Sequence, residues 1–203
     1  MERIDNELYF KTAETDLDFE KCFRLRYQVY CEEKRWLSPD DFPNKMEKDE
    51  YDSKAAHVMA LDADFNCIGI MRIIKECDHD RLPYIDHPGM KGKPYKAKNL
   101  AELSRLVITA TNNRNLVLKG LFRLVYLTSR RIGVDNWLFV SEPSLIRLGL
   151  RYKYFFDPIC TPAKYYGGFT LVAACDLVNT EARWKVSELD TWNFHWKEEA
   201  MMI

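Results

Sequence analysis

The sequence predicts a mixed α/β fold with a mostly antiparallel central sheet flanked by helices on both faces. A chain of 203 residues with 47% apolar and 30% charged side chains can build one full hydrophobic core. Short apolar runs with strand character alternate with segments in which apolar residues recur every three to four positions. Some runs are separated only by turn residues and others by a helix, which favours a mixed sheet.

The expected elements follow from these patterns. Segment 17–32 is predicted to be a helix because its aromatic residues recur at helical spacing. Segments 55–60 and 67–74 are predicted to be neighbouring strands because the turn-forming residues 62–66 join them. Pro143 suits the first turn of a helix. In order, we expect a strand at 8–12, a helix at 17–32, strands at 55–60, 67–74 and 99–108, a helix at 116–132, a strand at 136–140, a helix at 143–150, strands at 152–156 and 169–175, and an amphipathic helix at 180–201.

Charge and cysteine usage narrow the class of protein. The net charge of −1 gives no reason to expect binding to nucleic acid or to a membrane surface. No apolar run approaches the roughly 20 residues of a membrane span, and the N-terminus has no signal-peptide core. The six cysteines show neither a C-x-x-C pair nor metal-ligand spacing, so we expect reduced thiols, no metal site and a cytoplasmic location.

The apolar run at 99–108 contains three polar residues, Glu102, Ser104 and Arg105. On a regular strand, Glu102 and Ser104 would share one face and Arg105 would take the other. Arg72 interrupts the apolar strand at 67–74 in the same way. Buried ionisable groups are costly unless they are paired, so they indicate either a structural ion pair or a working site. These stretches alone support both interpretations.

Four motifs taken together resemble the N-acyl-homoserine-lactone (autoinducer) synthases of the GNAT acyltransferase superfamily. Long-chain N-acyl amino acid synthases are similar. The motifs are Arg26-x-x-x-Tyr30 followed by Trp36, then Asp49-Glu-Tyr-Asp52, then Arg72, and finally Glu102-x-Ser-Arg105. This resemblance covers residues 20–175 and implies a GNAT-like fold.

The resemblance also implies roles for these residues. Attack of an amine on an acyl thioester needs a base and a donor for the developing oxyanion. Glu102 is the expected base, with Ser104 either contacting the acceptor or bonding to backbone, and the amides of Leu106 and Val107 at a bulge as oxyanion donors. Tyr30 and Trp36 would belong to the site. An electrostatic network is expected from two carboxylates and three guanidiniums, with Glu102 as third anion: Arg26, Asp49, Asp52, Arg72 and Arg105.

The sequence leaves two interpretations open for a basic helix face and for a set of apolar residues. A basic helix face would either dock an acidic acyl carrier protein or be simply solvated: Lys119, Arg123, Arg130 and Arg131. Apolar residues of the later elements would line an acyl tunnel or form plain core: Leu121, Phe122, Leu124, Val125, Trp137, Phe139, Leu145 and Leu148.

Together these observations predict an N-acyltransferase that moves a fatty acyl group from a thioester to the amine of an amino acid or related metabolite. Segment 112–120 lacks the Gly-rich pyrophosphate turn of CoA-using relatives, which favours acyl carrier protein over CoA as donor and implies no tightly bound cofactor. The alternatives are an autoinducer (quorum-sensing) synthase using S-adenosylmethionine and a non-catalytic acyl-binding module. We expect an acyltransferase domain at 1–178, a helical tail at 179–203, and a monomer or weak dimer.

Overall fold

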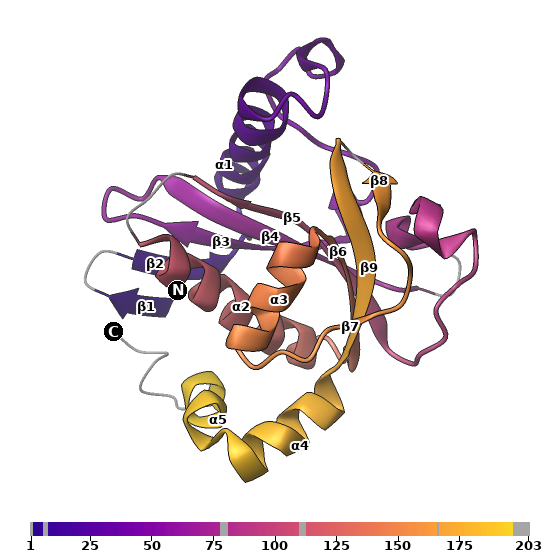
Figure 1. Cartoon of the computed structure of the whole chain (residues 1–203). Coiled ribbons are helices and arrows are strands. Elements are labelled where there is room, and N and C mark those ends of the chain that lie inside the picture. Colours follow the sequence, from indigo (N-terminus) through magenta and orange to yellow (C-terminus); the bar gives the residue numbers. More distant parts are fainter. Residues whose placement is uncertain (1, 6–7, 78–80, 110–112, 166, 197–203) are drawn as a thin grey trace. The chain divides into compact units, whose positions relative to one another are not determined.

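The computed structural model describes residues 2–5, 8–77, 81–109, 113–165 and 167–196 (Figure 1). These residues form two compact units, and each is described by itself. Unit 1 holds described residues from 2–73 and 105–128, and unit 2 holds those from 74–104 and 129–196. Three elements have residues in both units, namely β4 (Cys67–Lys75), β5 (Leu100–Ile108) and α2 (Arg114–Arg131).

The remaining elements belong to one unit each. Unit 1 contains β1 (Glu2–Asp5), β2 (Leu8–Thr12), α1 (Asp16–Tyr27), a π-helical turn (Gln28–Glu33), short 3-10 turns at Pro39–Asp41 and Asp52–Lys54, and β3 (Ala56–Leu61). Unit 2 contains 3-10 turns at Pro83–Asp86 and Pro88–Met90, β6 (Asn136–Ser141), α3 (Pro143–Arg151), β7 (Asp157–Pro158), β8 (Ala163–Tyr165), β9 (Gly168–Asp176), α4 (Leu177–Ser187) and α5 (Leu189–Trp196).

In unit 1 the strands run in the order β1-β2-β3-β4-β5, and the first three neighbouring pairs through β4 are antiparallel. Helices cover both faces of this sheet. Ile70 belongs to the core cluster that includes Cys22 and Leu25 of α1. At its neighbour Gly69, an added Cβ would lie 2.9 Å from Val117 of α2, so only glycine permits this close approach. Because neighbouring residues of a strand point to opposite faces, α1 and α2 lie on opposite sides (Figure 1).

In unit 2 the strand order is β5-β6-β9-β7, with β8 paired to β9. β5 and β6 are parallel, as expected of two strands joined through a helix, whereas β9 is antiparallel to β6, β7 and β8. The predicted fold class is therefore confirmed: a mixed, mostly antiparallel sheet with helices on both faces. Among the described residues, no helix has the length and apolar character needed to cross a membrane.

The strand predicted at 152–156 is wrong. The short strand of this region is β7, one residue further on, and the apolar residues before it are buried for another reason. Tyr154 and Phe156 are buried in an aromatic cluster with Trp137, with ring centroids of Trp137 and Tyr154 5.4 Å apart. A run of buried apolar residues thus reflected side-chain packing and not strand pairing.

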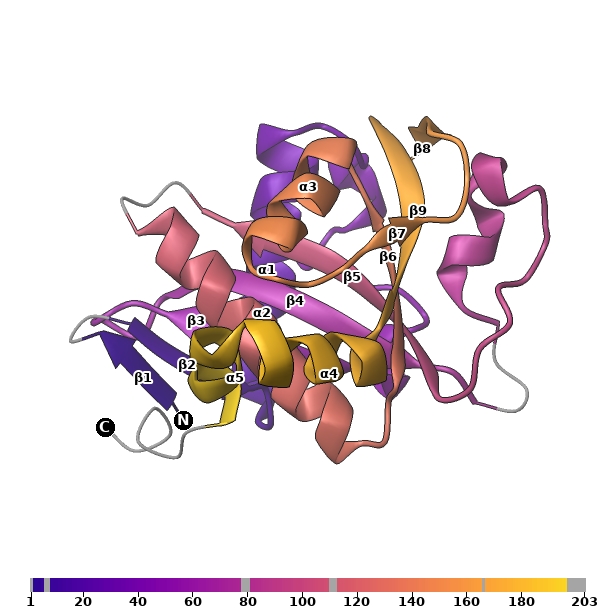
Figure 2. The same ribbon diagram turned by 60° about the horizontal axis from the view of Figure 1, so that its bottom comes forward.

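The tail is not one continuous helix. α4 ends at Ser187, and a second helix, α5, begins at Leu189, as Figure 2 shows. Glu188 between them leaves the helical region, with φ −135° and ψ 52°. Residues 197–201 of the predicted tail helix lie outside the described residues. Trp184 is fully buried and donates from Nε1 to the carbonyl oxygen of Lys153, so α4 packs within unit 2.

Candidate active site

Arg26 of unit 1 is placed by the way in which α1 begins and ends. Thr15 is the N-cap and forms a capping box with Asp18, which satisfies two amides at the start of the helix. Arg26 falls in the last turn, where a basic side chain is favoured by the helix dipole, and its side chain is fully buried. A buried guanidinium requires anionic partners.

Arg26 finds these partners in the acidic segment that precedes β3. Its Nη1 and Nη2 donate to the two carboxylate oxygens of Asp52 at 2.7 and 3.0 Å, a bidentate pair. Its Nε donates to Glu47. Both carboxylates are as deeply buried as the arginine, with 5% and 1% of their surface exposed. This segment is therefore not a solvated turn.

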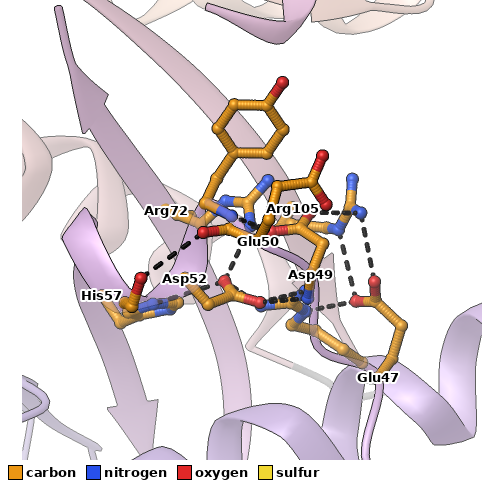
Figure 3. Close-up of polar contacts among 10 residues, drawn as sticks. Glu47, Asp49, Glu50, Asp52, His57, Arg72 and Arg105 are labelled. Atoms are coloured by element: carbon orange, nitrogen blue, oxygen red, sulfur yellow. Dashed lines mark hydrogen bonds and ion pairs between the residues drawn. The ribbon is translucent and has the colours of Figure 1, made fainter. Parts of the chain in front are cut away.

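The two other strand arginines complete the arrangement. Arg72 of β4 donates from Nη1 to Asp49 at 2.6 Å and to Asp52 at 2.7 Å. Arg105 of β5 donates from Nη2 to Asp49 at 2.8 Å and to Glu47 at 3.1 Å. Every arginine thus contacts two carboxylates of this set, and every carboxylate contacts two arginines. Figure 3 shows Arg72 and Arg105 among the three carboxylates. The result is a closed ring of alternating charge, which we call the arginine–carboxylate ring: Arg26, Asp52, Arg72, Asp49, Arg105 and Glu47.

The composition of this ring corrects the sequence interpretation. The structure brings together all five residues expected in the network, but the third anion is Glu47 and not Glu102. Glu47 lies in the acidic segment that precedes β3 and belongs to none of the four motifs. No motif therefore pointed to it. With three arginines and three carboxylates the ring has no net charge, which is what burial requires.

His57 is a second residue that the sequence analysis missed. It is fully buried on β3, where it makes edge-to-face contacts with the rings of Phe19 and Phe23, and its Nε2 lies 3.5 Å from Asp52 Oδ1. Burial lowers the pKa of His57 to about 4, with Arg26 and Arg72 acting in the same direction and Asp52 against it. The uncharged imidazole leaves the charge balance of the ring intact.

Burial alone would raise the pKa of Asp52, but the hydrogen bonds and positive charge of Arg26, together with Arg72, hold it well below its usual range. Burial alone would lower the pKa of the Arg105 guanidinium, but the negative charges of Glu47 and Asp49 raise it. The ion pairs thus favour the charged forms of Asp52 and Arg105. These paired charges hold α1, the acidic segment and the two strands together.

Two predicted aromatic residues lie beside the ring. Tyr30 follows α1 in the π-helical turn, and its ring stacks on Trp36 with centroids 5.7 Å apart. The Arg105 guanidinium lies 5.8 Å from the centroid of Tyr30, a cation–π distance. Trp36 retains 36% of its surface in contact with solvent. This part of unit 1 therefore offers an aromatic surface that can receive an apolar group.

Arg105 also changes the course of β5. Its φ is +53°, in the left-handed region that a non-glycine residue rarely adopts, and it lies in the middle of a strand. A residue in this conformation interrupts the regular alternation of a strand, as in a β-bulge. The ion pairs of Arg105 with Glu47 and Asp49 offset a conformational cost of about 1 kcal/mol. The amides of Leu106 and Val107 follow directly.

Glu102 belongs to unit 2 and is held differently. Only 3% of its surface is exposed, and its carboxylate accepts a hydrogen bond from the backbone N–H of Tyr84 at 2.6 Å. Tyr84 lies in a loop stabilised from within, because its hydroxyl accepts from the N–H of Tyr95. Ser104, two positions further along β5, is 9% exposed.

One residue of the predicted basic helix face is not on the surface. Arg123 is fully buried, so it does not belong to an exposed docking surface; the helical pattern placed it on the wrong side of α2. Arg130 forms ion pairs with Asp135 and Glu181 of unit 2 and is largely neutralised. Lys119 and Arg131 are exposed. In the described part of the chain, no three His, Cys, Asp or Glu side chains gather to hold a metal ion.

Solved structures share the fold of this chain. TofI, solved in a ternary complex with an inhibitor and MTA, matches with a TM-score of 0.71 at 17% identity, over 90% of this chain and 98% of TofI. The AHL synthase LasI matches with a TM-score of 0.70 at 18% identity, over 84% and 90% of the two chains. FeeM, an N-acyl amino acid synthase from uncultured soil microbes, matches with a TM-score of 0.63 at 12% identity, over 90% and 97%. The fold is that of the GNAT-like acyltransferases.

The sequence identifies the family to which the chain belongs. The family model described as "N-acyl amino acid synthase FeeM" matches residues 21–173, about three quarters of the chain, and the protein belongs to this family of acyltransferases. A search of curated proteins finds no significant match to the sequence. The predicted resemblance and the predicted enzyme class are both confirmed.

Proposed function

We propose that this protein is an N-acyltransferase that moves a fatty acyl group from a thioester to the amine of an amino acid or related metabolite. The observation that carries the proposal is the family match over residues 21–173, a range that includes the whole arginine–carboxylate ring and Glu102. The solved relatives support the fold of such an enzyme. They leave donor and acceptor open.

Glu102 is our candidate for the general base. A base must be ionised before it can accept the amine proton, and the hydrogen bond from the Tyr84 amide favours the ionised carboxylate. Its burial keeps the carboxylate away from bulk water, where a proton would be lost unproductively. The backbone amides of Leu106 and Val107, which follow the left-handed residue Arg105, are the proposed donors to the oxyanion.

The ring of unit 1 would support this chemistry without taking part in it. Its six side chains tie α1, the acidic segment and two strands together, and so they fix the aromatic surface of Tyr30 and Trp36. We assign positioning roles to Arg26, Arg72 and Arg105, because each of them pairs with two carboxylates of the ring.

For the donor, we propose acyl carrier protein, with acyl-CoA as the alternative. Segment 112–120 lacks the Gly-rich turn with which CoA-using relatives hold pyrophosphate, whereas the solved relative BjaI is described as a CoA-dependent acyl-homoserine lactone synthase. Lys119 of unit 1 is exposed, and it is our candidate for docking an acidic carrier.

The test is incubation of the purified protein with decanoyl carrier protein or decanoyl-CoA, pooled amino acids and S-adenosylmethionine, followed by mass spectrometry. We expect an N-decanoyl amino acid and equimolar free thiol, faster with the carrier protein. A decanoyl-homoserine lactone would instead identify an autoinducer synthase. Thioester binding with no release of thiol in any arm would reduce the protein to an acyl-binding module and contradict the proposal.

Carrier docking is tested by charge reversal. Lys119→Glu should raise the KM for decanoyl carrier protein about 3- to 10-fold at low salt, and less at 0.5 M salt, because surface charges steer encounter and are screened. Lys34→Glu, at another exposed lysine of unit 1, is the matched control. Equal KM values in both variants and the wild type would show that Lys119 is an ordinary solvated side chain.

A further inference from the structure

A cysteine and a histidine of unit 2 are paired in a way that the proposed reaction does not use. Cys160 precedes β8, and its Sγ lies 3.6 Å from Nδ1 of His87. His87 is 1% exposed, whereas Cys160 is only half-buried. A thiol beside an imidazole is the arrangement in which a cysteine becomes a nucleophile.

Hydrogen bonds fix the tautomer of His87. A backbone amide can only donate, so Nδ1, which receives the N–H of Gly89 at 3.1 Å, carries no proton. A carbonyl can only accept, so Nε2, which lies 3.1 Å from the carbonyl oxygen of Thr170, carries the proton. The nitrogen that faces Cys160 is therefore the unprotonated one, and its electron pair is shared between the Gly89 N–H and the thiol. Burial lowers the pKa of His87, which keeps the ring uncharged near neutral pH.

Backbone groups hold the sulfur beside the imidazole. The backbone N–H of Val172 donates to Cys160 Sγ at 3.2 Å and so fixes its position. Gly89 permits the close approach of the two segments, because an added Cβ would lie 2.3 Å from the carbonyl oxygen of Thr161 and 2.9 Å from Cys160 Sγ. The arrangement thus has the three parts of a nucleophilic triad: the thiol of Cys160, the base His87, and the carbonyl of Thr170, which orients the base.

We propose that Cys160 is a nucleophilic thiol, with His87 as its base, and that it takes an acyl group from a thioester. In this step His87 Nδ1 accepts the thiol proton, and Cys160 Sγ forms a bond to the acyl carbon. The bond from that carbon to the donor sulfur breaks, and the departing thiolate recovers the proton from His87. The product is an S-acylated Cys160 and one free donor thiol. The proposal rests on the proposed function only for the cellular source of the thioester.

The test uses S-decanoyl-N-acetylcysteamine, a small thioester that needs no carrier docking, with the full-length protein and no amine. We expect one decanoyl adduct, located on Cys160 by peptide mass spectrometry, removed by hydroxylamine and absent from Cys160→Ser. Cys77 is an exposed cysteine of the same unit and serves as an internal control for simple accessibility. We expect Cys160 to be acylated at least 10-fold faster than Cys77 in the same molecule.

His87→Gln should slow acylation of Cys160 at least 10-fold while leaving Cys77 unchanged. Thermal unfolding of each variant shows whether it is folded, and the comparison of the two cysteines in the wild type does not depend on the variant. No adduct on Cys160, or equal rates at Cys160 and Cys77, would overturn the proposal. N-acyl amino acid synthesis measured on the same preparation separates the two ideas: product formation without an adduct removes only the role of Cys160.

Discussion

Unit 1 and unit 2 bury their polar groups by opposite means. Unit 1 buries formal charges and balances them one against another in the arginine–carboxylate ring. Unit 2 buries groups that are held by backbone amides and carbonyls or by neutral side chains, as for Glu102, His87 and His195. The ring pairs each arginine with carboxylates, whereas Glu102 and His87 bond to backbone groups. This difference fits the proposed roles, in which the ring supports the site and Glu102 transfers the proton.

Removal of one charge from the ring should have the largest effect. Asp52→Asn keeps the shape of the side chain but leaves Arg26 and Arg72 without their shared anion. We expect a loss of about 3–5 kcal/mol in the free energy of unfolding, measured by urea denaturation, because an uncompensated buried charge is costly. Asp64→Asn, in an exposed turn of unit 1, is the control and should change it by less than about 0.5 kcal/mol. A similar small change in both variants would contradict the support role of the ring.

The same change of carboxylate to amide in unit 2 should act on rate. In Glu102→Gln the amide oxygen can still accept from the Tyr84 N–H, so we expect little loss of stability. Turnover should fall about 10²- to 10⁴-fold, the usual contribution of a general base. Glu76→Gln, at an exposed position of unit 2, should retain full turnover. Full activity of Glu102→Gln would remove Glu102 from the proposed role.

As the pH decreases, the protein should lose stability through His57 before it does so through its carboxylates. The unfolded chain takes up a proton at His57 near pH 6.5, whereas the folded protein resists until about pH 4, so stability falls as the pH decreases from 6.5 to 4. The charged groups that face His57 are Asp52, Arg26 and Arg72, and the arginines oppose its protonation. The loss is on the order of 2–3 kcal/mol by linkage.

His57→Gln isolates this effect, because its side chain cannot titrate. The buried His87, whose pKa is also lowered, acts in the same direction and remains in both proteins. The difference between the unfolding free energies of wild type and His57→Gln should therefore shrink from pH 7 to pH 4. A constant difference across this range would show that His57 titrates normally.

Below pH 3.8 stability falls further as carboxylates protonate, including Asp18. Burial would raise the pKa of Asp18, but Lys11 and backbone amides lower it to about 2.

The smallest effect is expected for a neutral pair of unit 2. Tyr154 donates its hydroxyl hydrogen to Nε2 of His195 at 2.6 Å, because Nδ1 of this ring donates to the carbonyl oxygen of Thr191. Tyr154→Phe removes the donor and should cost about 1–2 kcal/mol in thermal or urea unfolding. Tyr95→Phe, at a half-buried tyrosine of the same unit, should change stability less. A loss as large as that of Asp52→Asn would erase the contrast between the two units.

Much of the fold follows from periodicity. Strands and helices with a clear apolar pattern lie within a few residues of their predicted positions, as for β4 at Cys67–Lys75 and α3 at Pro143–Arg151. The errors occur where apolar residues serve packing alone. Tyr154 and Phe156 form an aromatic cluster in place of a strand, and Glu188 ends a helix whose amphipathic pattern continues beyond it.

The pattern of residues is enough to show which side chains are unusual. Arginines and a carboxylate within apolar strands indicate either buried ion pairs or a working site, because an unpaired buried charge is costly. Which groups pair with one another is visible only in the folded chain. Glu47 closes the ring and Arg123 turns inward, because pairing depends on distances between segments that are far apart in sequence. The pairing of Cys160 with His87, 73 residues away, has the same cause and left no local pattern to read.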